Sequence, residues 1–286
     1  MLIRKREITD LSAEIRGMID GRDADLRDNR EGVFSVLKND IHTLANLKNN
    51  QVDALRRDRD ALKDALADIS HQLKTPLTSM LLMADLLENA PPDRQAEFIA
   101  NIRTGLARTQ WLVSEFLKMA KLDAGAVEFA RESAGSGELV DLALEPLRIL
   151  LDVKDQRVAL SGETSFICDK RWTAEALSNV LKNASEYSPV GGEIRVETGE
   201  NPICAWISVT DSGEGLSNAE IARLFRRFEG SRGDKGYGIG LPLAFAIMRG
   251  QNGDIQASPH SAGRAGTPND GGGGVSGATF TLKLFK

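Results

Sequence analysis

The sequence predicts an α+β protein: a helical hairpin, which forms a dimeric four-helix bundle with a second copy, followed by a two-layer α/β sandwich. The first 75 residues contain no proline and the first hundred only three of the 27 glycines, whereas 14 glycines lie between Gly230 and Gly277. Because both residues end helices, the N-terminal part is expected to be long helix. From about Glu138, short helix-like and strand-like segments alternate instead.

Composition narrows the class of protein. The 286 residues suggest about two domains. With 36 Lys and Arg against 41 Asp and Glu, the net charge of −5 gives no overall attraction for nucleic acid. Two cysteines, Cys168 and Cys204, cannot build a disulfide framework or a four-thiolate metal site, which indicates a reducing environment. The sequence contains neither an apolar run long enough to span a bilayer nor a signal peptide.

Heptad spacing predicts the first long helix. Leu55, Leu62 and Ile69 are seven residues apart, and the polar residues Lys48 and Gln51 interrupt the apolar stripe upstream. Such a repeat is typical of a dimeric parallel coiled coil that leads into a helical bundle. The alternative is a single amphipathic helix packed on its own domain.

A second helix is expected from about Asp93 to Lys121, after the turn signal at residues 90–93. Apolar residues at helical spacing, such as Phe98 and Ile102, suit an antiparallel partner for the first helix. Two long helices joined by a short proline-rich turn form a hairpin, and two hairpins form a four-helix bundle.

The remainder of the chain predicts an α/β sandwich with antiparallel-looking hairpins. Residues 258–276, which include four consecutive glycines, are expected to form a flexible loop before the last strand. Helices are expected at Leu139–Leu151, Trp172–Glu186 and Pro242–Met248, and strands at Arg157–Leu160, Ser165–Cys168, Glu193–Glu197, Cys204–Thr210 and Ala278–Leu284.

His71 is a candidate nucleophile on the first helix. Ile69 and Leu73 belong to the apolar stripe, so His71, two residues from each, is expected to face solvent. Thr75 lies one turn later on the same face. Pro76 removes a backbone hydrogen bond and is expected to bend the helix beside His71. Taken alone, an exposed histidine is more often a plain surface residue.

Two further segments suit magnesium and adenine. Asn179 and Asn183 are one turn apart on one helix, so both amide oxygens project from the same face and suit Mg²⁺. Asp211, at a strand end, could accept a hydrogen bond from an adenine amine. Gly213 and Gly215 would then let the backbone approach the base.

A glycine-rich segment precedes the last predicted helix. Gly236, Gly238 and Gly240 would direct free backbone N–H groups and a helix N-terminus toward phosphate. This cluster lacks the strand, spacing and ribose-binding acid of a dinucleotide fold. Each segment alone is a weak signal, but the four in this order are a strong one.

From about Leu62 to its end, the chain resembles the catalytic core of the two-component sensor histidine kinases. The resemblance implies a dimerisation and histidine-phosphotransfer hairpin followed by an ATP-binding domain of the gyrase and heat-shock-chaperone ATPase type. The matching motifs are the H box at 71–77, the N box at 179–183, the G1 box at 211–215, the F box at Phe225 and Phe228, and the G2 box at 236–241.

The resemblance also implies a role for each matched residue. His71 would be the phosphoacceptor, and Thr75 would position water when phosphate is removed from a response regulator. ATP and Mg²⁺ are the implied cofactors, and a receiver domain and a second copy of the chain are the implied partners. Asn183, assisted by Asn179, would bind the metal. The implied ATP-binding residues are Asn179, Asn183, Tyr187, Asp211, Gly213, Gly215, Arg227, Gly236, Gly238, Gly240 and Leu241.

The resemblance and the helix pattern together predict four regions. Residues 1–60 resemble a HAMP-type signalling helix pair, 61–125 form the hairpin, 126–137 a linker and 138–286 the ATP-binding domain. In many relatives such a signalling segment follows transmembrane helices. The expected location is therefore the cytoplasmic portion of a membrane sensor, and a soluble kinase is the alternative.

Two positions depart from the family pattern. Gln72 stands where the family usually has an acidic residue thought to act as a general base, and an amide cannot take a proton. Glu186 stands at a position that is often basic. Slow autophosphorylation is therefore expected. The alternatives are a catalytically degenerate dimeric scaffold, a phosphatase-biased sensor, and a gyrase-like ATPase, which would leave His71 unexplained.

Overall fold

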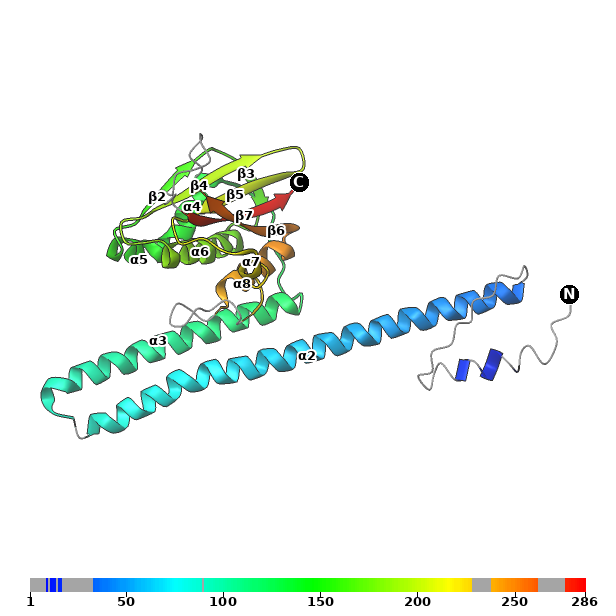
Figure 1. Cartoon of the computed structure of the whole chain (residues 1–286), viewed down its shortest axis with the longest axis horizontal. Helices are drawn as coiled ribbons and strands as arrows, with labels where there is room; N and C mark the ends of the chain where they lie inside the picture. Colours follow the sequence, from blue (N-terminus) through cyan, green and yellow to red (C-terminus); the bar gives the residue numbers. More distant parts are fainter. Residues whose placement is uncertain are drawn as a thin grey trace, which may run out of the picture. The chain divides into compact units, whose positions relative to one another are not determined.

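A computed structural model describes residues 9, 11–13, 15–16, 33–88, 90–227, 238–261 and 276–286 (Figure 1). The chain divides into two compact units, Met1–Ser70 and His71–Lys286. Helix α2, Val33–Glu88, belongs to both. In the described parts of the chain, no helix has the length and hydrophobicity needed to cross a bilayer.

The described part of the first unit consists mainly of the N-terminal portion of α2. Leu55 of the predicted apolar stripe is exposed in the single chain, as is Leu44 further upstream on α2. The coiled coil expected from this stripe stays a prediction.

The second unit begins with the helical hairpin (Figure 1). Helix α3, Pro92–Asp123, follows α2 through a short turn and confirms the helix expected at 93–121. Pro92 opens α3, where its missing N–H costs nothing. The helices approach closely at Gly105, where a Cβ would lie 2.6 Å from Cγ of Met80. Helix α2 contains Pro76 and continues for another three turns beyond it, and the bend expected there stays a prediction.

The rest of the unit is a two-layer α/β structure, as predicted. Its five-stranded sheet has the order β2-β4-β5-β7-β6. Alternate residues of β4 are buried, as expected for a sheet covered on one face. The strands are β2 (Arg157–Ser161), β4 (Glu193–Glu200), β5 (Cys204–Thr210), β6 (Gly253–Ser261) and β7 (Ser276–Phe285), and β1 (Glu132–Gly135) pairs separately with β3 (Ser165–Cys168).

Helices α4, α6 and α8 form the second layer (Figure 1). Their inner faces and the sheet enclose one core, in which Leu177, Ile247 and Phe280 are fully buried. Both cysteines are buried and unpaired, as expected. The helices are α4 (Ser136–Leu144), the 3₁₀ turn η1 (Glu145–Leu147), α5 (Arg148–Val153), α6 (Lys170–Tyr187), α7 (Asn218–Ile221) and α8 (Gly240–Gly250).

Four features differ from the expectations. The helix expected at 139–151 is divided by η1 at Pro146, whose ring cannot follow a regular helical turn. Strand β1 lies within the predicted linker, and β6 extends to Ser261, into the predicted loop. The pairing of β2 with β4 is parallel and not one of the expected antiparallel hairpins, because β3 and α6 lie between these two strands in the chain.

Truncation of the sheet core should unfold this domain more readily. Ile207 of β5 is 1% exposed, so Ile207→Ala should lower the free energy of unfolding by about 2–5 kcal/mol. The matched control, Ile203→Ala, removes the same atoms from a side chain that is 70% exposed, and should change it by less than about 1 kcal/mol. Urea denaturation measures both values, and equal losses would contradict the assigned core.

Candidate active site

His71 lies on the exposed surface of α2, as helical spacing predicted. Leu73 packs against the core cluster, so the two side chains occupy different faces of the helix. The hydroxyl of Thr75 donates to the backbone carbonyl oxygen of His71 over 3.3 Å, and Thr75 is also exposed. Gln72 is half-buried beside them. The imidazole is thus accessible to a second domain or protein.

A separate cavity of about 280 Å³ lies at the ends of β5 and α6. It brings together four residues that the sequence predicted for ATP: Asn183, Tyr187, Asp211 and Gly215. Its other lining residues are Glu214, Leu216, Leu224 and Ala278. Ala278 could not be identified from sequence, because only the pairing of β5 with β7 brings it beside Asp211.

The carboxylate of Asp211 is buried and fixed by the backbone. Its Oδ1 accepts hydrogen bonds from the amides of Gly213, at 2.9 Å, and Ala278, at 3.1 Å. A Cβ on Gly277 would overlap the carbonyl oxygen of Asp211, so this approach requires glycine. Gly215 has a φ of +83°, which also favours glycine. A buried carboxylate in this position can accept a hydrogen bond from an amine.

Helix α6 holds both predicted metal ligands. Asp169 caps its first turn by accepting from the amide of Trp172 at 3.1 Å. One turn apart, Asn183 lines the cavity, whereas Asn179 lies outside its lining. The amide nitrogen of Asn179 donates to the carbonyl oxygen of Glu175 at 3.0 Å. Within the described ranges, no group of three or more His, Cys, Asp or Glu is placed to hold a metal ion.

The start of α8 lies against Asn179. A Cβ on Gly240 would be 2.7 Å from the amide oxygen Oδ1 of Asn179, so the first residue of α8 must be small. Gly238 has a φ of +64°, and Leu241 is buried in the core. The predicted residues Gly236 and Phe228 lie outside the described residues. Together, Gly238, Gly240 and Asn179 place the N-terminus of α8 beside the N box.

Arg227 occupies a different environment from the one predicted. Its guanidinium binds both carboxylate oxygens of Asp123, at the end of α3, over 2.7 Å, and it does not line the cavity. Phe225 of the same segment packs on Phe245 of α8, with ring centroids 5.3 Å apart. On α6, Oε1 of Glu186 lies 4.0 Å from Nζ of Lys182.

Two family models match the chain. Residues 61–125 match the His Kinase A (phospho-acceptor) domain. Residues 168–286 match the histidine kinase-, DNA gyrase B-, and HSP90-like ATPase. The first match contains the exposed His71, and the second contains every residue that lines the cavity beside Asp211.

Curated histidine kinases are similar to most of this chain. The chain is 29% identical over 225 residues to the histidine protein kinase DivJ of Caulobacter vibrioides, a match that covers 73% of this chain and 38% of that protein. It is 30% identical over 220 residues to the signal transduction histidine-protein kinase/phosphatase MprB of a Mycobacterium species, covering 73% and 42%. The chain thus spans less than half the length of either relative.

A solved structure shows a similar fold. The histidine kinase ThkA, in complex with the response regulator protein TrrA, matches with a TM-score of 0.62 and 18% identity, over 84% of this chain and 66% of that one. The phosphoacceptor and ATPase domains, matched in the order that the sequence motifs predicted, show that the chain belongs to the two-component sensor histidine kinases.

Proposed function

We propose that this chain transfers the γ-phosphoryl group of ATP to His71, and from there to an aspartate of a response regulator. The observation that carries the proposal is the exposed His71 on a hairpin joined, in one chain, to a cavity lined by Asn183, Tyr187 and Asp211. In the protein-histidine kinases these are the two halves of one reaction.

Asp211 and its neighbours are the proposed adenine site. Two backbone amides hold its carboxylate in a fixed orientation, so no reorganisation is needed to accept the exocyclic amine of adenine. Tyr187 and Leu216 supply apolar surface for the base. The cavity volume, about 280 Å³, suits the nucleoside end of ATP rather than the whole molecule.

The phosphates would extend toward the start of α8, where Gly240 meets Asn179. Backbone N–H groups at a helix N-terminus favour anions. Asn183, with Asn179 one turn away, presents the hard oxygen ligands that suit Mg²⁺. When bound, the metal would neutralise phosphate charge, and the chain's own contribution is to hold these oxygens and amides in place.

His71 is the proposed nucleophile. One imidazole nitrogen forms a bond to the γ-phosphorus while the bond from that phosphorus to the bridging oxygen breaks, and ADP leaves. The attacking nitrogen uses its lone pair, and the proton on the other imidazole nitrogen passes to solvent after the transfer, because the amide of Gln72 has no basic atom. The amide oxygen of Gln72 can accept from the other imidazole nitrogen and orient the ring. Positioning therefore accounts for most of the expected rate, which should be modest.

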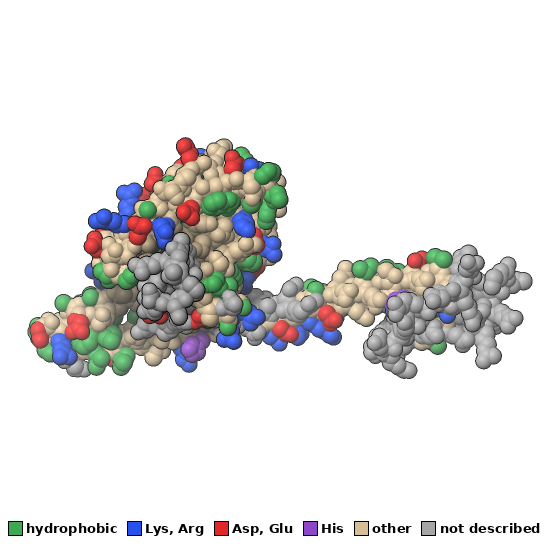
Figure 2. All heavy atoms as spheres, turned by 45° about the horizontal axis from the view of Figure 1, so that its top comes forward, with side chains coloured by type: hydrophobic (Ala, Val, Ile, Leu, Met, Phe, Trp, Pro, Cys, Tyr) green, Lys and Arg blue, Asp and Glu red, His purple; other side chains and the backbone are tan. Residues whose placement is uncertain are grey.

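The chain's surface supports a dimer and a receiver-domain partner. Figure 2 shows hydrophobic side chains gathered on the hairpin around its turn. This set, left exposed in one chain, suits the core of a four-helix bundle with a second copy. ThkA binds its response regulator as a histidine kinase of similar fold, which supports a receiver domain as the partner here. The exposed residues are Leu77, Leu81, Leu82, Leu86, Ile99 and Leu106.

Phosphate removal from the same partner is a second proposed activity. Thr75 is exposed one helical turn after His71 and could orient water there. MprB, of which the chain covers 42%, is named a kinase/phosphatase, which supports this activity.

His71→Gln should abolish labelling by γ-labelled ATP, since no other described residue occupies the phosphoacceptor position. Wild-type label should be acid-labile and alkali-stable, as expected of a phosphohistidine. Gln72→Glu should label at least as fast as the wild type, because it adds a proton acceptor. Loss of labelling in Gln72→Glu would contradict the role given to Gln72, and ATP binding without any wild-type label would favour the scaffold alternative.

Gly277→Ala should weaken ATP binding at least tenfold, because the new Cβ displaces the backbone of Asp211. Asp211→Asn should do the same by replacing one acceptor oxygen with a donor. The control is Gly137→Ala, where a Cβ meets nothing within 4 Å. Isothermal titration with ATP measures all three variants, and unchanged affinity in Asp211→Asn would exclude the proposed adenine site.

A further inference from the structure

One face of α3 is buried against the ATPase domain. The buried residues of this helix are Leu112, Glu115 and Met119, spaced by three and four positions along one stripe. Leu112 and Met119 join the same core cluster as α6 and α8. Glu115, only 3% exposed, lies between them. An apolar contact between two domains therefore has a carboxylate at its centre.

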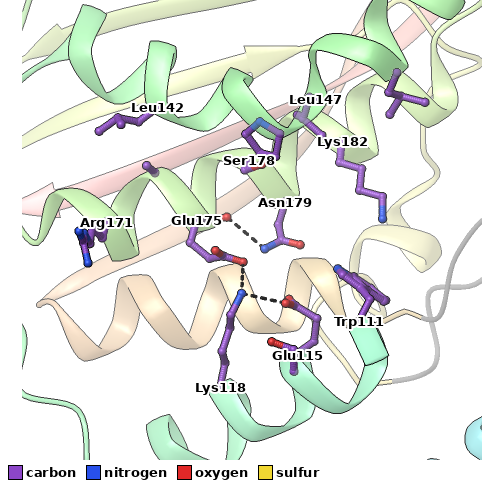
Figure 3. Close-up of a pocket in the computed structure, with 14 residues that line it drawn as sticks. Trp111, Glu115, Lys118, Leu142, Leu147, Arg171, Glu175, Ser178, Asn179 and Lys182 are labelled. Atoms are coloured by element: carbon purple, nitrogen blue, oxygen red, sulfur yellow. Dashed lines mark hydrogen bonds and ion pairs between the residues drawn. The ribbon is translucent and has the colours of Figure 1, made fainter. Parts of the chain in front are cut away.

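The carboxylate belongs to a compact charge cluster shared by α3 and α6 (Figure 3). The ammonium of Lys118 bridges two acids, at 2.8 Å from Oε1 of Glu115 and 2.7 Å from Oε1 of Glu175. Lys182 of α6 lies over the ring of Trp111 of α3, with Nζ 4.5 Å from the ring centroid. Each helix thus contributes one acid and one lysine.

Burial makes this arrangement costly for docking. Removing a carboxylate from water costs several kcal/mol, and apolar residues of similar volume often bind more tightly than a buried ion pair. Desolvation raises the pKa of Glu115, although Lys118 and Lys182 counteract it. Desolvation lowers the pKa of Lys118, but its hydrogen bonds to Glu115 and Glu175 outweigh this and leave it raised. Lys118 therefore offsets the cost of burying the acids, and loss of its ammonium would leave the two carboxylates of Glu115 and Glu175 together without a counter-charge.

The cluster lies beside an open groove rather than a sealed core. The groove has a volume of about 630 Å³, and its walls include Leu142, Pro146 and Arg171 as well as the cluster. Solvent can therefore reach the charges when the two helices separate, which lowers the cost of opening.

We propose that Glu115, Lys118 and Glu175 form a charge latch that docks the ATPase domain on α3 reversibly. Docking requires the ammonium of Lys118 between the two acids. It strengthens when Glu115 is neutral, because one buried charge is removed while Lys118 stays paired with Glu175. The latch does not depend on the proposed phosphoryl transfer, because docking is a property of the chain without ATP.

The latch lies level with the phosphoacceptor. Met80 meets Gly105 where α2 and α3 run antiparallel. His71 precedes Met80 by as many residues as Ser114 follows Gly105. In an antiparallel pair His71 is therefore level with Ser114, the residue before Glu115. The smaller cavity has no lining residue from the described parts of α2 or α3. The next step rests on the proposed transfer to His71. For that transfer, the ATPase domain must leave its docked position on α3 to bring ATP to the imidazole.

The direction of the pH effect follows from the raised pKa of Glu115. The charged groups that face it are Lys118 on its own helix and Glu175 and Lys182 on α6, with Arg171 on the groove wall. An acid whose pKa is higher when docked takes up a proton on docking. Docking is therefore expected to be tighter on the acid side of the raised pKa of Glu115, and to weaken as pH rises through that value.

Trp111 provides a direct measure of docking. Trp172→Phe and Trp206→Phe leave it as the sole tryptophan, and its emission should shift to the red when α6 separates from α3. Lys118→Glu places three carboxylates together and should cause this shift. The charge exchange Lys118→Glu with Glu175→Lys restores two acids and one ammonium and should reverse it. The matched control is Glu138→Gln, which alters a 2.9 Å pair with Lys170 inside the ATPase domain.

Glu115→Gln should remain docked at neutral pH and lose the pH dependence, since the amide is neutral throughout. Hydrogen exchange of the α3 amides near Glu115, in the chain with all three tryptophans, gives a second measure that needs no Phe replacements. The latch would be overturned if Lys118→Glu had the hydrogen-exchange protection or the Trp111 emission of the wild type. It would also be overturned if Lys118→Glu were folded but undocked and the added Glu175→Lys change did not restore docking. If Lys118→Glu autophosphorylates faster than the wild type at unchanged ATP affinity, the latch controls the proposed transfer. If Lys118→Glu undocks but neither it nor the wild type is labelled by ATP, the result counts against the proposed function and not against the latch.

Discussion

The pairing of β7 with β5 is the constraint on which the nucleotide cavity depends. Thr210, the last residue of β5, pairs with Thr279, so the next residue, Asp211, lies beside Ala278. The amide of Ala278, 67 positions away in sequence, then fixes the Asp211 carboxylate. With the amide of Gly213 it satisfies Oδ1 and prevents the acid from turning into the core. The polar wall of the cavity is therefore a consequence of strand register.

A second constraint is the periodicity of the hairpin helices. It places Leu73 against the core and leaves His71 in solvent, so one helical turn serves both packing and chemistry. On α3 the same periodicity collects Leu112, Glu115 and Met119 on one stripe. In the proposed latch, the glutamate in that stripe makes the contact with the ATPase domain depend on charge, which an apolar residue of similar volume would not do.

Local patterns predicted the long helices and several strands, including β3 and β5, with accurate bounds, because their signals lie within a few residues. Strands β1 and β6 were missed for a related reason. Each contains glycine or proline and gains its pairing only from a distant strand, so its own sequence reads as a linker or loop. The parallel pairing of β2 with β4 is likewise invisible before the crossover by α6 is known.

The sequence by itself determined the order of the motifs and the exposure of His71, because spacing along one helix fixes that exposure, and the family resemblance of the motifs implied the residues of the proposed adenine site. Tertiary structure alone decided that Ala278 completes the cavity, that Arg227 binds Asp123, and that Glu115 is buried between two lysines and a second acid. Each of these depends on which surfaces meet across the fold. A surface charge and an interface charge have the same sequence pattern, and only packing distinguishes them.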